Sequence, residues 1–343
     1  MTGALNDLLQ ATSRSFYLTL RVLPRAIRPQ IGLAYLLART TDTIADTEIV
    51  PPEQRLEALQ KLRERILGQN STPLNFRNLA EQQGSPAEKL LLEKVEYSLT
   101  ALQKFSEADQ KLIRKVLEII SSGQELDLRR FAGASADTII ALESAADLDD
   151  YTYRVAGCVG EFWTQMCTTH LFRTPELEDS GTSFEKLGVR FGKGLQLVNI
   201  LRDLPADLKK GRCYLPREQL ERAGIWPEVM LSPVKQEKFL PLYREYLDKA
   251  EAHLEAGWQY TNAIPWRRAS VRLACAWPIL IGLKTIEKLR AAGVFELQQR
   301  VKVSRNEVWS IILRSILTYP APAIWRKLAL PTAKAVASED ELA

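Results

Sequence analysis

Apolar residues recur at helical spacing along most of this chain. In residues 53–67, five of them fall on one face of a helix: Leu56, Leu59, Leu62, Ile66 and Leu67. Similar patterns predict helices over 86–104, 107–131, 186–204, 234–256, 267–291 and 304–318. Few segments alternate with a period of two, and neither Asn-Gly nor Asp-Gly occurs as a hairpin turn. The pattern therefore predicts an all-α fold without a sheet.

The chain has 343 residues, which at about 150 residues per domain would allow two domains. The breaks between the predicted helices are short, none has the composition of an interdomain linker, and no helical repeat of fixed period occurs. We therefore expect a single helical domain over residues 1–330. The polar residues 331–343 are expected to form a flexible tail.

Composition and charge limit the class of protein. Hydrophobic residues make up 46% and charged residues 26% of the chain, as in folded globular proteins. The net charge of +4 suits an anionic ligand or a membrane surface but is too small to indicate a nucleic acid partner. The longest stretches without a formal charge have eleven residues, whereas a membrane-spanning helix needs about 20 apolar residues, so we expect no transmembrane helix. The segment 308–325 is apolar enough either to touch a membrane surface or to pack onto the protein.

Cysteine and histidine are scarce, which argues against several chemistries. The four cysteines form no CxxC pair, so we expect neither a zinc site nor a redox pair but buried thiols in a reducing compartment. The two histidines, His170 and His253, lie in no recognisable nucleophile motif. The N-terminus lacks the basic start and the apolar stretch of a secretory signal. We expect a cytoplasmic protein, either fully soluble or in peripheral contact with a membrane.

Two pairs of aspartates are spaced four residues apart within largely apolar helices: Asp42 with Asp46, and Asp203 with Asp207. At this spacing the two Cβ atoms lie about 6 Å apart on one helical face, where like charges repel. A cation removes this penalty, and Mg²⁺ typically binds one or two carboxylates together with phosphate oxygens. The pairs therefore predict a Mg²⁺ site that holds diphosphates between two facing helices. The alternative is that both pairs lie on solvated helix surfaces.

Basic residues accompany both pairs. Arg39 precedes Asp42 by three positions, Arg202 adjoins Asp203, and Arg212 follows the second pair. Arginine can bind a phosphate through two parallel hydrogen bonds. We therefore expect these arginines to contact the diphosphate groups of a substrate.

Four motifs, at compatible spacing, resemble the signatures of the squalene/phytoene synthase family. They are residues 13–16 (SRSF) with 35–46 (YLLARTTDTIAD), residues 151–160 (YTYRVAGCVG), residues 196–216 (QLVNILRDLPADLKKGRCYLP) and residues 274–278 (ACAWP). The resemblance covers roughly residues 10–310. It implies a single-domain, all-α isoprenoid synthase fold with a central cavity.

The resemblance also implies an activity. Members of the family join two allylic prenyl diphosphates head to head, with Mg²⁺ held by the two aspartate regions. Squalene synthases condense two farnesyl diphosphates to presqualene diphosphate, a cyclopropylcarbinyl diphosphate, and then reduce it with NADPH to squalene. Phytoene synthases lose a proton instead of accepting a hydride.

Roles follow for residues that match the motifs. Asp42, Asp46, Asp203 and Asp207 would hold the metal, and Tyr151 would assist proton transfer or hydrogen-bond the departing diphosphate. The residues implied in substrate binding are Arg14, Ser15, Phe16, Tyr35, Arg39, Gln196, Asn199, Arg202 and Arg212. The residues implied in binding NADPH are Ser13, Arg14, Lys302 and Arg305. The family has no Rossmann domain, so basic side chains would have to bind the phosphates of the cofactor.

The choice among family members depends on details of these motifs. Asp42-Thr43 and residues 160–163 (GEFW) resemble squalene synthases, whereas Tyr153-Arg154 and residues 214–216 (YLP) also occur in phytoene synthases. We expect squalene synthase activity. The alternatives are a phytoene, dehydrosqualene or hydroxysqualene synthase, and a non-catalytic helical assembly factor that keeps the fold.

Overall fold

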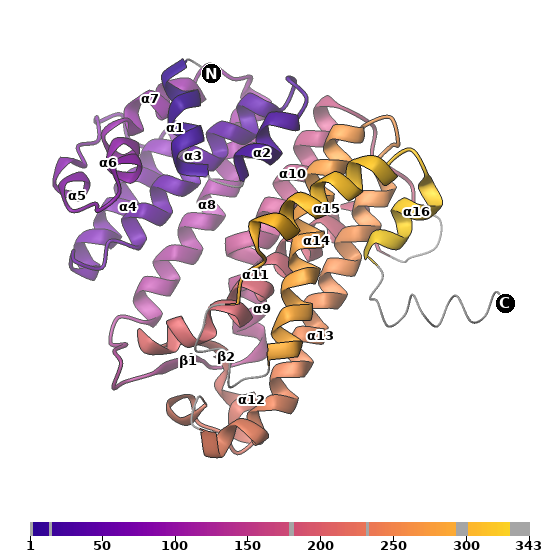
Figure 1. Cartoon of the computed structure of the whole chain (residues 1–343). Helices are drawn as coiled ribbons and strands as arrows, with labels where there is room; N and C mark the ends of the chain where they lie inside the picture. The colour runs from indigo at the N-terminus through magenta and orange to yellow at the C-terminus, as the bar shows by residue number, and fades with distance from the viewer. Residues whose placement is uncertain (1–2, 14–15, 178–181, 231–232, 293–300, 330–343) are drawn as a thin grey trace.

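The computed structural model describes residues 3–13, 16–177, 182–230, 233–292 and 301–329. The all-α fold is confirmed, because helices form almost all of the described secondary structure (Figure 1). The N-terminal part consists of α1 (Gly3–Ser13), α2 (Phe16–Val22), α3 (Arg28–Ala45), α4 (Pro52–Leu67), α5 (Arg77–Glu81), α6 (Pro86–Glu93), α7 (Val95–Leu102) and α8 (Glu107–Arg130).

The C-terminal part follows directly along the chain. Its elements are β1 (Ile140–Leu142), α9 (Ala145–Thr152), the π-helical turn η1 (Tyr153–Gly157), α10 (Cys158–His170), α11 (Phe184–Lys209), β2 (Arg212–Pro216), α12 (Arg217–Arg222), the 3₁₀ turn η2 (Pro227–Val229), α13 (Pro233–Ala263), α14 (Ala269–Ala292), α15 (Arg305–Thr318), α16 (Pro322–Arg326) and the 3₁₀ turn η4 (Lys327–Ala329). The expected tail, 331–343, lies outside the described residues, and the expectation of one domain over 1–330 stays a prediction.

The predicted helices are confirmed with small changes at their ends. The helix predicted over 86–104 is divided into α6 and α7, which meet at Lys94. The helix predicted over 186–204 begins at Phe184, where the Ser183 hydroxyl accepts a hydrogen bond from the Lys186 backbone N–H. It continues past Pro205 and ends at Lys209. As a result, α11 carries the whole second aspartate pair.

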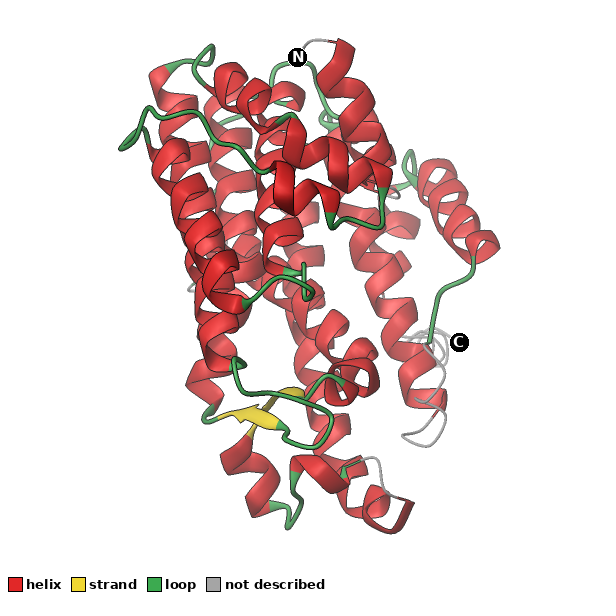
Figure 2. Cartoon of the chain, turned by 90° about the vertical axis from the view of Figure 1, so that its left-hand side faces the viewer, coloured by secondary structure: helices red, strands yellow, loops and turns green. Residues whose placement is uncertain are grey.

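The prediction that the chain has no sheet is wrong in one place. β1 and β2 form a two-stranded parallel sheet in which Ile140 lies opposite Arg212 and Ala141 opposite Cys213. Figure 2 shows both strands at one end of the helices. The pairing joins segments about seventy residues apart and both are short, so no local alternation indicated it. The sheet matters because it fixes Arg212 and Tyr214 beside the C-terminal end of α8.

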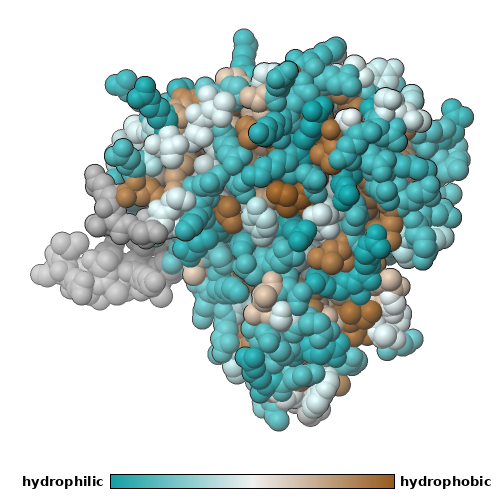
Figure 3. All heavy atoms as spheres, turned by 180° about the vertical axis from the view of Figure 1, so that it is seen from behind, coloured by the Kyte–Doolittle hydropathy of each residue, from teal (hydrophilic) through white to brown (hydrophobic). Residues whose placement is uncertain are grey.

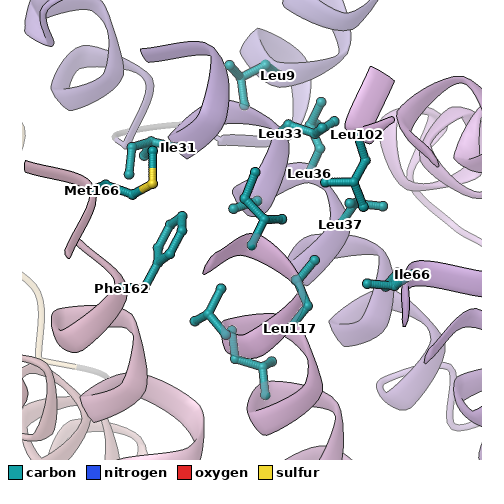
Figure 4. Packing of buried hydrophobic residues seen from close by; sticks show 14 of the residues in the cluster. Leu9, Ile31, Leu33, Leu36, Leu37, Ile66, Leu102, Leu117, Phe162 and Met166 are labelled. Atoms are coloured by element: carbon teal, nitrogen blue, oxygen red, sulfur yellow. The ribbon is translucent and has the colours of Figure 1, made fainter. Parts of the chain in front are cut away.

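The core has two clusters of buried apolar side chains. The first gathers mainly α1–α8 and α10, and the second gathers mainly α9, α11, the two strands, α13 and α14. Figure 4 shows the first cluster, in which Leu36 of α3, Leu117 of α8 and Phe162 and Met166 of α10 converge. Phe162 is therefore a core residue, as expected for a large aromatic side chain.

Close approach of α10 and η1 to α11 depends on glycine. A Cβ atom at Gly160 would lie 1.9 Å from the carbonyl oxygen of Gly188, and one at Gly192 would lie 2.1 Å from that of Ala156. Both distances are far inside van der Waals contact, so side chains at these positions would force the backbones apart. Glycine thus sets the position of η1, which belongs to the second sequence motif, against α11.

One described helix, α14, is long and apolar enough to cross a membrane by length and composition alone. Of its most apolar window, 61% is buried inside the protein, and the helix packs against α11, α13 and α15. This burial is typical of a core helix. The face of the molecule seen in Figure 3 is mainly hydrophilic, with apolar residues scattered over it.

Candidate active site

The first aspartate pair lies at the C-terminal end of α3. Asp42 is in the last turn, and Asp46 is the exposed C-cap residue whose backbone N–H bonds to the Asp42 carbonyl at 2.8 Å. Oδ1 of Asp42 accepts a hydrogen bond from Nε2 of Gln124, which comes from α8. Arg39 lies 4.0 Å from the other Asp42 oxygen and bonds to Glu88 of α6 at 2.5 Å. The Asp42 carboxylate is therefore held between α3 and α8.

The second pair lies near the end of α11. Arg202 donates two hydrogen bonds to its neighbour Asp203, from Nε at 3.0 Å and from a terminal nitrogen at 2.5 Å. Burial and the nearby charge of Asp203 raise the pKa of Asp207 to about 7, although Arg212 and Lys210 oppose the shift. In this conformation Asp203 is neutralised by Arg202, whereas Asp207 has an electrostatically unfavourable environment.

A cavity of about 250 Å³ lies where α3, α8, α9, α11 and β2 meet. Five residues proposed from the sequence line it: Asp42, Asp46, Tyr151, Gln196 and Arg212. Three polar residues that the sequence analysis did not single out line it as well: Gln124, Asp127 and Tyr214. A neighbouring cavity of about 280 Å³ shares Asp127 and Arg212 with the first and adds Arg55 and Lys210. The site is thus an acidic cavity with a basic border.

Tyr151 is the residue on which the two aspartate regions converge. It lies in the last turn of α9, immediately before the π-helical turn η1, and it is buried. Single π-helical turns are rare and occur often at functional sites. Burial raises the pKa of Tyr151 far above its usual range, and the charges of Asp127, Asp207 and Asp42 raise it further. The charges of carboxylates on α8, α11 and α3 therefore all act on one hydroxyl group.

Asp127 is a functional candidate that the sequence analysis missed, and Tyr214 is one that it quoted within a motif without assigning a role. The Tyr214 hydroxyl donates a hydrogen bond to Oδ2 of Asp127 at 2.9 Å, and it is also hydrogen-bonded to the Tyr151 hydroxyl. The two tyrosine rings stack with centroids 4.7 Å apart. One local signal was present, since Gln124 and Asp127 are spaced to lie on the same face of α8. Asp127, Tyr214 and Tyr151 thus form a continuous chain of hydrogen-bonded side chains along one wall of the cavity.

The other described residues proposed from the sequence lie outside the cavity lining, and these include Arg39, Arg202, Asp203 and Asp207. Tyr35 donates a hydrogen bond to the Thr12 carbonyl at 3.1 Å, and the buried Ser13 hydroxyl bonds to the Leu9 carbonyl within α1. Asn199 is half-buried on α11. Arg14 and Ser15 lie outside the described residues, as does the side chain of Phe16. Lys302 and Arg305 are exposed near the start of α15, and they do not line either cavity.

The acidic residues fit a Mg²⁺–diphosphate group in their chemistry. Within the described part of the chain, no three acidic, cysteine or histidine side chains gather tightly enough to hold one ion alone. Mg²⁺ does not require this, because it completes its shell with water and substrate phosphate oxygens. Burial, helped by the charge of Asp46, raises the pKa of Asp42 to about 6, and burial raises that of Asp127 to about 6. A bound cation would stabilise the charged form of both groups.

The helical fold is that of the isoprenoid synthases. The sequence model of the squalene/phytoene synthase family matches residues 9–307, so the chain belongs to this family. The chain is 32% identical to a presqualene diphosphate synthase of Rhodopseudomonas palustris over 75% of its own length and 77% of that protein. It is also 32% identical to a presqualene diphosphate synthase of Zymomonas mobilis, over 90% and 91% of the two chains.

Relatives with lower sequence identity are named squalene synthases. The squalene synthase of Schizosaccharomyces pombe is 25% identical over 90% of this chain, which spans 64% of that protein. Among solved structures, TcSQS with ligand E5700 superposes with a TM-score of 0.72 at 23% identity, over 90% of this chain and 84% of that one. A dehydrosqualene synthase with ligand has a TM-score of 0.63 at 20% identity, over 92% and 95%. These two structures support the fold, and the family indicates an enzyme of the prenyltransferase type.

Proposed function

We propose that the protein joins two farnesyl diphosphates head to head to form presqualene diphosphate and then reduces this product with NADPH to squalene. One observation carries the first half of the proposal. Asp42 and Asp46 of the first pair line one cavity with Asp127 and the buried Tyr151 hydroxyl, and the charge of Asp207 from the second pair also acts on that hydroxyl. Separate solvated helix surfaces, the alternative interpretation of the aspartate pairs, would not bring these charges together.

The cavity offers what departure of a diphosphate requires. Asp42 and Asp46, which line the cavity, and Asp203 and Asp207, near the end of α11, are the residues that would hold Mg²⁺. When bound, Mg²⁺ would neutralise the negative charge that develops on the leaving diphosphate. Arg212 at the border of both cavities is placed to donate hydrogen bonds to phosphate oxygens.

Tyr151 supplies a polar group where the rest of the wall is partly apolar. Because its pKa is raised far above the usual range, the hydroxyl stays protonated and acts as a hydrogen-bond donor. It can donate to a diphosphate oxygen as the carbon–oxygen bond breaks. Val155, Ile120 and Leu128 line the same cavity and limit the access of water to the carbocation.

The two halves of the proposal have different support. The NADPH step is supported by the relatives named squalene synthase, which match about 90% of this chain at 25–27% identity. NADPH would supply the hydride that quenches the second carbocation. The second candidate function is release of presqualene diphosphate as the final product, which the two relatives at 32% identity favour by name.

Product analysis tests both halves at once. Purified protein is incubated with farnesyl diphosphate and Mg²⁺, with and without NADPH, and the products are identified by mass spectrometry after chloroform extraction. We expect presqualene diphosphate without NADPH, and squalene with consumption of NADPH when the cofactor is present. Presqualene diphosphate under both conditions would establish the second candidate. Absence of diphosphate release with farnesyl or geranylgeranyl diphosphate would contradict the enzyme assignment.

A further inference from the structure

Helix α15 presents a stripe of large apolar side chains to the outside. Trp309, Leu313, Ile316 and Leu317 are 59%, 58%, 46% and 69% exposed, and their spacing places them on one face of the helix. Ile324 of the following helix α16 is 55% exposed. We call these five residues the outer stripe. Most other exposed large apolar residues of the described chain, such as Tyr97 and Trp226, belong to separate elements.

The opposite face of α15 already packs against the protein. Ile312 and Ser315 are buried, and the Ser315 hydroxyl accepts a hydrogen bond from Nε1 of Trp277 in α14 at 3.0 Å. A capping box at Ser304 and Glu307 fixes the start of the helix. Since the inward face of α15 makes the contacts with α14, the outer stripe is not needed for this packing.

An aromatic cluster around the buried Trp325 anchors the end of this region. The Arg272 guanidinium lies over the rings of Trp266, Tyr319 and Trp325, at 4.7, 6.0 and 5.6 Å from the ring centroids. Arg272 also donates hydrogen bonds to the carbonyl groups of Asn262 and Ile264. Trp325 is fully buried. Rotating α15 and α16 to hide the outer stripe would break this cluster, so the stripe is held at the surface.

The segment that carries the stripe is strongly positive. Residues 301–329 contain one acidic side chain, Glu307, and five basic ones: Lys302, Arg305, Arg314, Arg326 and Lys327. This short segment therefore carries a net charge of +4, equal to that of the whole chain. Glu307 is paired with Lys288 at 2.7 Å, while all five basic residues are exposed. The apolar stripe thus has a basic border whose acidic member is neutralised.

We propose that the outer stripe and its basic border form a docking surface for the interface of a bilayer that contains anionic lipids. An apolar helical face with tryptophan and leucine, flanked by lysine and arginine, is the composition of helices that lie in the plane of a membrane. Each basic residue near such a surface is attracted by its negative potential. An apolar partner protein would not require this concentration of positive charge. The inference rests on the surface alone and does not depend on the proposed catalytic function.

Vesicle flotation tests the proposal. The full-length protein is mixed with phosphatidylcholine vesicles, either pure or containing about 30% phosphatidylglycerol, at low and at high salt. We expect binding to the anionic vesicles, weaker binding to neutral vesicles, and loss of binding as salt screens the charges. The variant Trp309→Ser/Leu313→Ser/Leu317→Ser should bind roughly tenfold more weakly or worse, because it removes buried apolar area. The variant Arg314→Glu/Lys327→Glu should lose the preference for anionic lipid.

Matched controls separate the stripe from general surface effects. Trp226→Ser/Tyr97→Ser removes two exposed aromatic residues elsewhere and should bind vesicles as the wild type does. All variants should keep the wild-type melting temperature and, in lipid-free buffer, the wild-type rate of diphosphate release. Equal vesicle binding by the wild type and the triple variant would overturn the proposal. So would a wild-type dimer that the triple variant makes monomeric, or vesicle binding that begins only after residues 331–343 are removed.

Discussion

The Tyr214 hydroxyl donates a hydrogen bond to Oδ2 of Asp127 at 2.9 Å, which joins the strand β2 to the helix α8 across 87 residues of sequence. The same tyrosine stacks on Tyr151 and bonds to its hydroxyl. Asp127 can thus hold the Tyr214 proton toward itself, so that the Tyr214 oxygen accepts the Tyr151 proton while no substrate is bound and releases it when a diphosphate oxygen takes its place. The two hydrogen bonds of Tyr214 therefore orient the Tyr151 hydroxyl in the cavity without requiring Asp127 to touch a substrate.

Replacing Tyr214 by phenylalanine tests this positioning role. Tyr214→Phe keeps the ring and the stacking but removes the hydroxyl between Asp127 and Tyr151. We expect kcat to fall about tenfold with little change in KM, because a hydrogen bond aligned for the transition state is worth about 1–2 kcal/mol. Steady-state kinetics with farnesyl diphosphate measure both constants. Tyr151→Phe combined with Tyr214→Phe should cost less than the sum of the two single changes.

A control for the lost hydroxyl comes from α13. The Tyr243 hydroxyl donates to the Leu201 carbonyl at 3.2 Å, and Tyr243 is buried but lines neither cavity. Tyr243→Phe should lower the free energy of unfolding by about 1 kcal/mol and leave kcat unchanged. An equal loss of kcat in Tyr214→Phe and Tyr243→Phe would mean that the Tyr214 effect is only structural.

The second aspartate pair should show opposite effects on activity and on stability. Asp207→Asn removes a proposed metal ligand, so kcat should fall by about two to three orders of magnitude. The same change removes a carboxylate whose charged form is disfavoured by burial and by Asp203, so the metal-free protein should melt at the same temperature or higher. Asp149→Asn, at an exposed carboxylate paired with Lys193, is the control and should keep full turnover. Wild-type turnover in Asp207→Asn would contradict the proposed site.

The raised pKa values predict the pH dependence of stability. Asp207 and Asp127 have folded pKa values of about 7 and about 6, above the ordinary value of 3.8 that applies in the unfolded chain. These two carboxyl groups therefore bind more protons in the folded state than in the unfolded state between about pH 4 and 7, and their contribution to the free energy of unfolding decreases as pH rises. Burial lowers the pKa of His253 to about 4, which opposes this decrease only in part. In EDTA the protein should be more stable at about pH 5 than at about pH 8, as measured by urea unfolding. In Asp207→Asn this decrease should be smaller, and an increase of stability over the same range would contradict the assignment.

The two aspartate pairs could be predicted from the sequence because their spacing is a local property. The spacing of Asp203 and Asp207 on an apolar helix, and of Asp42 and Asp46 on another, is visible within five residues. Asp127 was missed because it precedes Arg129 and Arg130 in a charged segment that resembles a solvated helix surface. Its importance comes from contact with Tyr214, which is distant in the sequence, and from the burial that this contact creates.

The small sheet illustrates the same limit. Parallel pairing of Ile140 with Arg212 depends on how α8, α9 and α11 are placed, and short buried strands have no distinctive period. The bidentate pairing of Arg202 with Asp203 was equally inaccessible, since adjacent side chains on a helix do not usually face each other. The starts of most predicted helices, in contrast, lie within two residues of the observed ones because caps and apolar spacing are local properties, whereas α11 and α13 end five and seven residues later than predicted.

The close packing of η1 on α11 predicts a large effect from a single methyl group. In Gly192→Ala the new Cβ would meet the Ala156 carbonyl oxygen at 2.1 Å, and neither backbone can move without shifting the η1 segment. We expect a loss of about 1–3 kcal/mol in the free energy of unfolding and a lower kcat, because Tyr151 directly precedes η1. Gly84→Ala is the control, since its Cβ would have no atom within 4 Å. Unfolding and kinetics of the two variants should differ clearly, and similar stability would mean that the helices can separate at no cost.

Charge reversal at Lys302 tests the proposed binding of NADPH. A cofactor with several negative phosphate charges, and no glycine-rich loop to hold it, needs lysine and arginine side chains. Lys302→Glu should therefore raise the apparent KM for NADPH in lipid-free buffer and let presqualene diphosphate accumulate. Its formation should continue at the wild-type rate, because that step depends on the aspartates and Tyr151. Lys327→Glu is the matched control, since it reverses an exposed charge of the same basic segment and should leave the KM for NADPH unchanged. Equal values of KM for NADPH in the wild type and in both variants would exclude Lys302 from the cofactor site.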